Sequence, residues 1–99
     1  MSTSSPPKAL RLDPSDNVAV VISALGAGDE VALEGVRVVA REAIGFGHKI
    51  ALAAIPAGAP VRKYGEVIGI ATADITAGAH VHVHNVVSAR LPGAQAAAR

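Results

Sequence analysis

Glycine interrupts this 99-residue chain so often that long regular elements are excluded over its second half. Only short runs rich in Val, Ile and Ala separate the glycines at positions 45, 47, 58, 65, 69 and 78. A glycine within an extended stretch commonly marks a bulge, a tight bend or a close backbone approach. The spacing therefore predicts a small, strongly bent β module rather than a flat sheet.

Turn signals divide the chain into short extended pieces. We expect a hairpin from residues 30–33 and 36–40, because Glu34-Gly35 between them is a good turn signal. Further strands are expected at residues 48–55, from Val61, at 67–71 and at 80–86. A weak repeat, Ile-x-Ala-Gly-Ala-x-Val, occurs at residues 55–61 and 75–81, and two copies are too few for a solenoid.

One short helix is expected near the N-terminus. Asp13-Pro14-Ser15-Asp16 is typical of a helix start, because Pro is favoured in the first turn and Asp or Ser can accept free backbone N–H groups. The aliphatic residues 18–22 would continue this helix, and Gly26 would cap it. Residues 1–9 and 89–99 are expected to be tails, which leaves one domain over residues 10–88.

Composition excludes several classes of protein. Nine basic and eight acidic residues are mixed along the chain, for a net charge of +1, so neither the basic stripe nor the stacking aromatics of a nucleic-acid-binding protein is present. The absence of cysteine excludes disulfides and thiolate metal sites. No signal peptide or membrane-spanning run is evident, so we expect a cytoplasmic protein. Only Phe46 and Tyr64 are aromatic, which favours a partner chain or a homo-oligomer.

Three of the four histidines alternate with valines in His80-Val81-His82-Val83-His84-Asn85. On a strand, all three imidazoles would project from one side and both valines from the other. Two imidazoles at this spacing can share one divalent cation, which makes His82 and His84 candidate ligands for zinc or iron. The alternative is a polar strand face, solvated or in an interface, with no metal.

Gly47-His48-Lys49 holds the fourth histidine. His48 could be a metal ligand or a proton carrier, since an unperturbed histidine has a pKa of about 6.5. Lys49 could bind a substrate carboxylate, or it could be an ordinary surface lysine. On a strand these two neighbours would point to opposite faces.

Tyr64-Gly65-Glu66 is a further polar motif. Tyr64 could donate a hydrogen bond to a sugar hydroxyl or relay a proton, and Glu66 could act as a base. The alternative is that Tyr64 covers the small core and that Glu66 pairs with Lys63 or Arg62. Asn85 would bond to backbone in the turn after the last strand, or orient a histidine.

In this order, the motifs resemble the small domain of the UxaA family, which includes altronate and galactarate dehydratases and sulfolactate sulfo-lyase. The resemblance covers about residues 12–88, and the ordered combination of motifs is specific although no single motif is diagnostic. The matching residues are Asp16-Asn17-Val18-Ala19-Val20, Gly28, Gly47-His48-Lys49-Ile50-Ala51-Leu52, Ile55, Gly58, Val61, Lys63-Tyr64-Gly65-Glu66-Val67-Ile68-Gly69, Ala71-Thr72, Ile75, Gly78 and His80-Val81-His82-Val83-His84-Asn85.

The resemblance implies an SAF domain of β-clip fold, so the expected fold class is mainly β with one short N-terminal helix. It also implies a metal-dependent lyase acting on a sugar acid or related 2-hydroxy acid, present here as a small subunit that needs a large catalytic subunit. The expected cofactor is a divalent metal, iron first, with zinc or manganese as alternatives. Implied roles are catalytic for His48, Tyr64 and Glu66, substrate-binding for Lys49, His80 and Asn85, and metal-binding for His82 and His84.

The implied chemistry is β-elimination, in which a proton leaves the carbon beside a carboxylate while water or sulfite leaves the next carbon. A base would take the proton, and a metal would stabilise the resulting enolate and activate the leaving group. The competing hypothesis is a non-catalytic SAF-type module that recognises a sugar acid or stabilises a complex. An independent metal-dependent hydrolase is a weaker alternative, because the small core offers nothing to close a pocket around a substrate.

Overall fold

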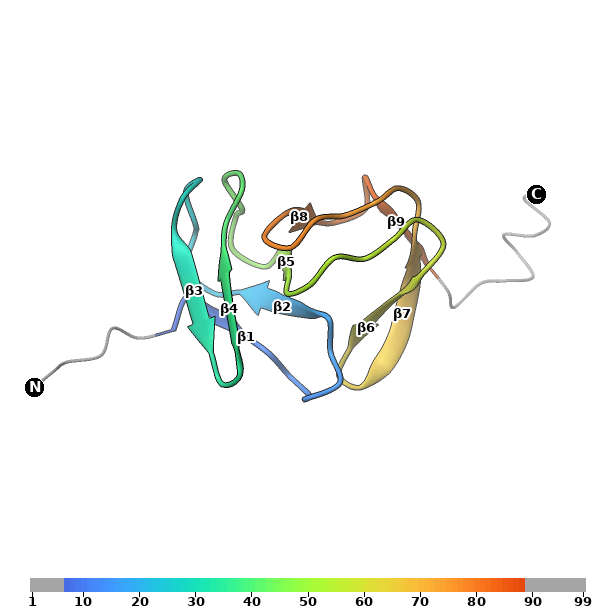
Figure 1. Ribbon diagram of the computed structural model, residues 1–99, viewed down its shortest axis with the longest axis horizontal. Helices are drawn as coiled ribbons and strands as arrows, with labels where there is room; N and C mark the ends of the chain where they lie inside the picture. Colours follow the sequence, from blue (N-terminus) through green and yellow to red (C-terminus); the bar gives the residue numbers. More distant parts are fainter. Residues whose placement is uncertain (1–6, 89–99) are drawn as a thin grey trace, which may run out of the picture.

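The computed structural model describes residues 7–88, and this part of the chain contains strands and turns but no helix (Figure 1). The mainly β prediction is therefore confirmed. The strands are β1 (Ala9–Leu10), β2 (Val18–Val21), β3 (Glu30–Leu33), β4 (Val36–Val39), β5 (Lys49–Ala51), β6 (Pro60–Lys63), β7 (Glu66–Ala71), β8 (His80–Val81) and β9 (Val86–Ser88).

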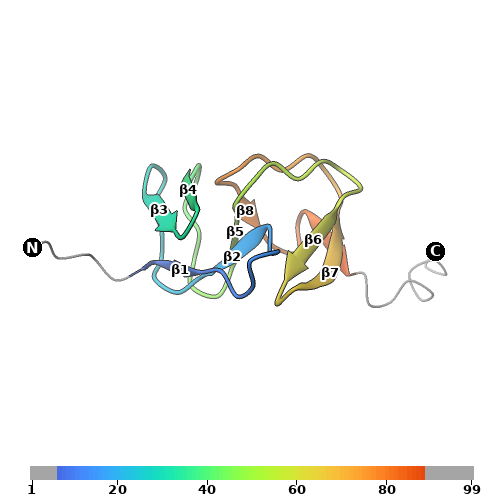
Figure 2. The ribbon, with the colours of Figure 1, turned by 60° about the horizontal axis from the view of Figure 1, so that its bottom comes forward.

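The strands form three antiparallel sheets arranged along the long axis of the molecule. The β3–β4 hairpin lies at one end, the sheet β1-β2-β5-β8 lies in the middle, and the sheet β6-β7-β9 lies at the other end (Figures 1 and 2). In the middle sheet β5 pairs with β2 on one side and with β8 on the other, and Ile50 faces His80 in the register. This pairing brings residues 48–51 beside residues 79–81, which are about 30 positions later.

The middle sheet separates two hydrophobic clusters, because alternate residues of its strands point to opposite faces. Ala19 and Ile50 belong to the cluster that extends under the β3–β4 hairpin. Their neighbours Val18 and Ala51 belong to the second cluster, which contains Val81 and extends toward β6 and β7. Both faces of these short strands are therefore covered, and this explains why they are almost continuously aliphatic.

Four turns of the same shape organise the chain. Each follows the pattern aliphatic-x-x-Gly-x-x-aliphatic, with both aliphatic side chains buried and with a backbone hydrogen bond of 2.9–3.1 Å across the turn. The glycine has a φ of 85–93°, as the third residue of a type II turn requires. The turns lie at residues 25–31, 44–50, 55–61 and 75–81. Sequence reasoning found the last two copies, whereas the first two differ from them at the positions between the anchors.

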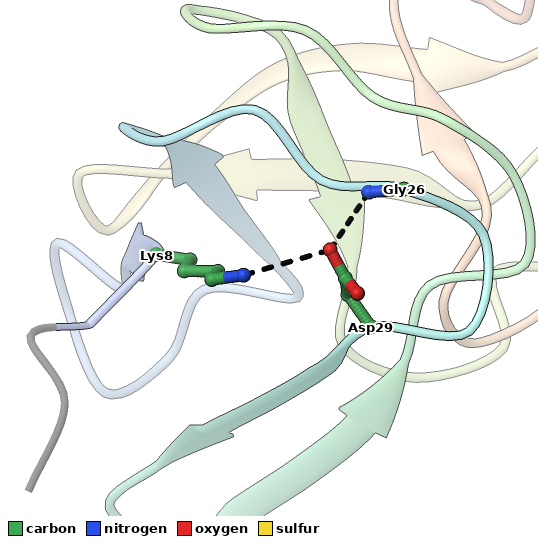
Figure 3. A network of polar contacts seen from close by, with 3 residues as sticks. All are labelled: Lys8, Gly26 and Asp29. Carbon is green, nitrogen blue, oxygen red and sulfur yellow. Dashed lines mark hydrogen bonds and ion pairs between the residues drawn. The ribbon is translucent and has the colours of Figure 1, made fainter.

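Bridges between aliphatic anchors join the turns in pairs: Leu25 pairs with Ile44, and Ile55 pairs with Ile75. The first turn is further held by Asp29, whose carboxylate accepts a 2.8 Å hydrogen bond from the Gly26 N–H and lies 3.6 Å from the Lys8 ammonium (Figure 3). Lys8 precedes β1, so this ion pair fastens the start of the described chain to the hairpin end of the molecule.

The predicted N-terminal helix is wrong. Residues 13–16 form a single turn, in which the Asp16 N–H donates to the Asp13 carbonyl at 2.9 Å, and the aliphatic residues after it form β2. Valine is a poor helix former and a good strand former, and β2 gains the backbone partners of both β1 and β5.

Two strand predictions are also wrong in extent. β5 covers only Lys49–Ala51 rather than residues 48–55, and the expected strand at 80–86 breaks into β8, a turn and β9. Most of the predicted tails lies outside the described residues. Ala9, which was assigned to the first tail, is part of β1, pairs with Val21 of β2 and is fully buried.

Candidate histidine site

All four histidines of the chain lie together, where the start of β5 meets the end of its antiparallel partner β8 at the edge of the middle sheet. His48 comes two residues before Ile50, and Ile50 pairs with His80, so His48 and His80 share one face of the sheet. The Nδ1 atom of His48 lies 2.7 Å from the Nε2 atom of His80. Two imidazoles at this separation are hydrogen-bonded through a single proton.

The four imidazoles form a continuous row in the order His82, His48, His80, His84. The rings of His82 and His48 are stacked, with centroids 3.8 Å apart and planes 10° apart. The His48 and His80 centroids are 4.9 Å apart, and those of His80 and His84 are 4.8 Å apart with the planes tilted by 37°. We call these four residues the histidine row.

Asn85 shapes the turn that carries His82 and His84. Its side-chain oxygen accepts a 3.0 Å hydrogen bond from the His82 N–H, and its amide nitrogen donates to the His80 carbonyl at 2.9 Å. The Asn85 N–H also donates to the His82 carbonyl at 3.1 Å. The predicted bonding of Asn85 to the backbone of this turn is confirmed. Val81 is buried and Val83 is 81% exposed, because the chain leaves the strand between them and enters the turn. The expectation that the two valines share a face is therefore wrong.

Two members of the row, His80 and His82, lie in surroundings that favour the neutral imidazole. Burial lowers the pKa of His80, the positive charges of His84 and His48 lower it further, and the Glu42 carboxylate acts in the opposite direction. Burial likewise lowers the pKa of His82, together with the charges of His48 and Lys49. A neutral imidazole keeps one nitrogen lone pair free, which is the form that accepts a hydrogen bond or binds a cation.

Three members of the row can hold a metal ion. His48, His80 and His82 each offer a ring nitrogen, and the three nitrogens lie within 4.8 Å of one another. Two nitrogens bound to one tetrahedral zinc at about 2.0–2.1 Å lie about 3.3 Å apart, so a pair at the 4.8 Å limit would need to approach by about 1.5 Å. Within residues 7–88, the buried Nδ1 atom of His82 has no hydrogen-bond partner. A buried nitrogen without a partner is costly, and a cation would satisfy it. The residues therefore fit a divalent metal.

His84, which was predicted to form a metal pair with His82, is not part of this triad. Its ring contacts His80 at the exposed end of the row. The residue that takes its place is His48, which lies more than 30 positions away in the sequence from His80 and His82 and which no local spacing could connect to them.

Lys49 lies beside the row but on the opposite face of β5, as the alternation of side chains predicted. It pairs with Val81 in the register, and it is half-buried. Burial lowers its pKa, and the Lys63 charge lowers it further. A half-buried ammonium group next to a second one is well suited to an anionic ligand, because an anion relieves both effects.

Tyr64 and Glu66 are not brought into the histidine row. Tyr64 occupies the β6–β7 turn, whose tip lies at the edge of the molecule opposite the loop after β8 (Figure 1). Its side chain is 66% exposed, and the Lys63 ammonium lies 5.3 Å from the ring centroid. Its backbone has a φ of 60°, a left-handed conformation that is uncommon for a bulky residue.

Two carboxylates hold the backbone near the candidate residues, and sequence reasoning identified neither of them. Asp16 is buried, and its oxygens accept hydrogen bonds from the N–H groups of Tyr64 at 3.0 Å and Gly65 at 2.8 Å. The sequence analysis placed Asp16 at the start of a helix and therefore did not predict that it binds this turn. Glu42 accepts a 3.1 Å hydrogen bond from the His80 N–H, and no motif in the sequence marks it.

No helix in the part of the chain that the structure describes is long and apolar enough to span a membrane. The described residues thus form a bent β module that carries a row of histidines. A sequence profile of the altronate/galactarate dehydratase SAF domain matches residues 7–89. The chain therefore belongs to the altronate/galactarate dehydratase SAF domain family, and the predicted resemblance is confirmed.

Individual relatives agree with this assignment. The chain is 47% identical over 76 residues to the altronate dehydratase of Escherichia coli K12 and 37% identical over 76 residues to that of Bacillus subtilis 168. Each alignment covers 77% of this chain but only 15% of the relative, so the match spans about one-seventh of those enzymes. The chain is also 46% identical over 54 residues to the (2R)-sulfolactate sulfo-lyase subunit alpha of Paracoccus pantotrophus, which covers 54% of this chain and 81% of that subunit.

Proposed function

We propose that this chain is the small component of a lyase that eliminates water or sulfite from a sugar acid or related 2-hydroxy acid, and that it acts with a large partner chain. The observation that carries the proposal is the histidine row, because it gathers every histidine of the chain at one surface of a domain whose family is named for such lyases. The names of the relatives, two altronate dehydratases and a sulfo-lyase subunit, support this class of reaction.

His48, His80 and His82 would hold a divalent metal, with iron as the expected ion and zinc or manganese as alternatives. The closeness of their three nitrogens and the unpartnered Nδ1 atom of His82 support this assignment. A metal bound there would supply a Lewis acid that polarises the substrate carboxylate and the leaving group. This assignment moves His48 from the proposed catalytic residues to the ligands.

His84 then becomes the group that moves a proton. It lies at the exposed end of the row beside His80, where a substrate has access to it. As a base it would take the proton from the carbon next to the carboxylate, and that bonding pair would form the new double bond as the neighbouring C–O or C–S bond breaks. Lys49 lies on the other face of β5, but its charge reaches His82, and from there it would bind the substrate carboxylate. Asn85 would hold the turn of His82 and His84 in place.

The catalytic roles proposed for Tyr64 and Glu66 rest on the resemblance alone. Tyr64 would act only if the substrate or the large chain reached across from the histidine row to the β6–β7 turn. Lys63, which directly precedes Tyr64, lies near enough to Lys49 for its charge to lower the pKa of Lys49.

The need for a large partner is supported by two observations. The three histidines are half-buried, and a groove in the described residues lies elsewhere, lined by Pro7, Leu10, Arg11 and Leu33 among others. A substrate bound at the row would therefore be covered on one side only. The subunit-alpha relative is named as one subunit of its enzyme, and it is similar in extent to the aligned domain.

A second candidate is a non-catalytic module that binds a sugar acid, and the open surface of the row favours it. An activity assay separates the two. Dehydration of altronate and galactarate, and release of sulfite from sulfolactate, are measured with this chain alone, with the large lyase chain of the same organism alone, and with the mixture. The lyase proposal requires activity in the mixture that is lost with His82→Ala and retained with Glu30→Gln, a change to an exposed residue of the β3–β4 hairpin. Undiminished activity with His82→Ala would favour the binding module.

A further inference from the structure

Two apolar side chains are more exposed than any other large hydrophobic residue in the described part of the chain. Phe46 is 74% exposed, and Val83 is 81% exposed. Both lie in the turns that carry the histidine row: Phe46 comes two residues before His48, and Val83 lies between His82 and His84. Because the rings of His48 and His82 are stacked at 3.8 Å, these two turns are neighbours.

The fold itself does not require an aromatic residue at position 46. In the four type II turns the equivalent positions are Ala27, Phe46, Ala57 and Ala77, so three copies of the same turn are built with alanine. Two of these turns contain a histidine of the row, His48 in residues 44–50 and His80 in residues 75–81, and only the first carries a large apolar side chain there. Burying such an aromatic side chain removes on the order of 150–250 Å² from water, and here that surface is left in water.

The turns that present these side chains are ordered. The Gly47 N–H donates to the Val21 carbonyl at 2.8 Å, and the His48 N–H donates to the Gly45 carbonyl at 3.1 Å. The Asn85 side chain closes the second turn with hydrogen bonds at both its ends. Large apolar groups that project from well-ordered backbone beside a polar site are typical of interface anchors, because little conformational entropy is lost when a partner covers them.

We propose that Phe46 and Val83 are the anchors of an interface that seats the large lyase chain over the histidine row. This inference rests on the proposed function and adds the surface through which the two chains meet. The occupant is a large lyase chain because this domain aligns with only 15% of the altronate dehydratases, and the proposed function assigns the rest of the site to a chain equivalent to their remaining length. Its contact surface would offer an apolar pocket to Phe46 and would complete the wall that the row lacks.

The test measures association of the full chain with the large lyase chain of the same organism by titration calorimetry and size-exclusion chromatography. Phe46→Ala installs the residue that the other three turns carry, so its fold is expected to be unchanged, and Val83→Ser removes the second anchor. Each is expected to weaken binding by on the order of tenfold or more, as central interface residues do. Val67→Ser on β7, which is 38% exposed and outside both turns, is the matched control and should bind like the unaltered chain.

Zinc binding by the isolated Phe46→Ala and Val83→Ser variants should equal that of the unaltered chain, which would show that the row is intact. Tight binding of the large chain by both variants would overturn this interface and leave the proposed function in place. A self-dimer that Phe46→Ala abolishes, with no binding of the large chain, would overturn the proposal in favour of a second copy as occupant. Failure of the unaltered chain to bind the large chain, together with no activity in the mixture, would overturn both the interface and the proposed function.

Discussion

The Nδ1 atom of His48 and the Nε2 atom of His80 lie 2.7 Å apart although 32 positions separate the two residues in the chain. Antiparallel pairing of β5 with β8 produces this contact, since Ile50 and His80 face each other in the register and His48 lies on the same face as Ile50. The contact places His48, which is isolated in the sequence, in the same site as the histidines at 80, 82 and 84. The experiments below test the parts of that arrangement.

Metal binding should depend on the triad and not on the fourth histidine. Titration of the metal-free chain with zinc is expected to show one site, which His48→Ala or His82→Ala abolishes because each removes one of only three ligand nitrogens. His84→Ala is the matched control and should bind at nearly the original affinity. Equal losses for His84→Ala and His48→Ala would show instead that the metal lies toward the exposed end of the row.

Asn85→Ala should disturb the site without touching a ligand. It removes the acceptor of the His82 N–H and the donor to the His80 carbonyl, so the turn of residues 82–85 loses its side-chain closure. We expect a loss of zinc affinity of about 10–100-fold, the usual effect of a residue that orients a ligand, and a loss of stability of about 1–2 kcal/mol. Asn85→Asp retains the acceptor and should show a smaller loss of stability in thermal unfolding.

Gly47 and Gly45 form a matched pair around Phe46. A Cβ at either glycine would have open space, but only Gly47 has a positive φ, of 85°. Gly47→Ala is therefore expected to reduce stability by about 1–2 kcal/mol, because an L-residue is strained in that conformation. Gly45→Ala should change it by no more than about 0.5 kcal/mol. Chemical denaturation of both variants measures the difference, and similar stabilities would contradict the type II geometry assigned to this turn.

Tyr64→Asn should make the chain more stable. Tyr64 and Gly65 both have positive φ in the two-residue β6–β7 turn, and Asn-Gly is the preferred pair for such a turn. Relief of the backbone strain should stabilise the folded chain by on the order of 1 kcal/mol. This gain exceeds the free energy lost when the exposed contact between the Tyr64 ring and the Lys63 ammonium is removed. If Tyr64 acts in the reaction, the more stable variant will lower activity of the reconstituted complex. A lower midpoint of thermal unfolding would contradict the strain.

Asp29 should make stability depend on acidic pH. The hydrogen bond from the Gly26 N–H lowers the pKa of Asp29 below its ordinary 3.8, and the Lys8 charge lowers it further. A carboxyl group with a lowered folded-state pKa contributes stability above its unfolded pKa, and that contribution is lost as pH falls through the folded value. Asp29→Asn is therefore expected to be less stable than the unaltered chain near neutral pH, with the difference disappearing as the pH falls through the lowered folded-state pKa of Asp29. A difference that persists undiminished in acid would contradict an ionic origin.

Sequence reasoning performed best where a feature depends on neighbouring residues. The hairpin around Glu34-Gly35 and the turn role of Asn85 both follow from local chemistry, and both are present. It failed at residues 13–22, where local helix-start signals competed with strand pairing. The carboxylate of Asp16, which could have capped a helix, instead holds the Tyr64-Gly65 turn nearly 50 positions later. No local pattern can show that partner.

The sequence by itself determined that this chain is a bent, mainly β module of its family, because glycine spacing and aliphatic runs restrict the backbone over only a few residues at a time. It also showed that the histidines are the unusual chemistry of the chain. Only the tertiary structure decided that His48 rather than His84 joins His80 and His82, since that choice depends on the register between two strands. Such a register is a property of the whole packed core, to which residues from both halves of the chain contribute.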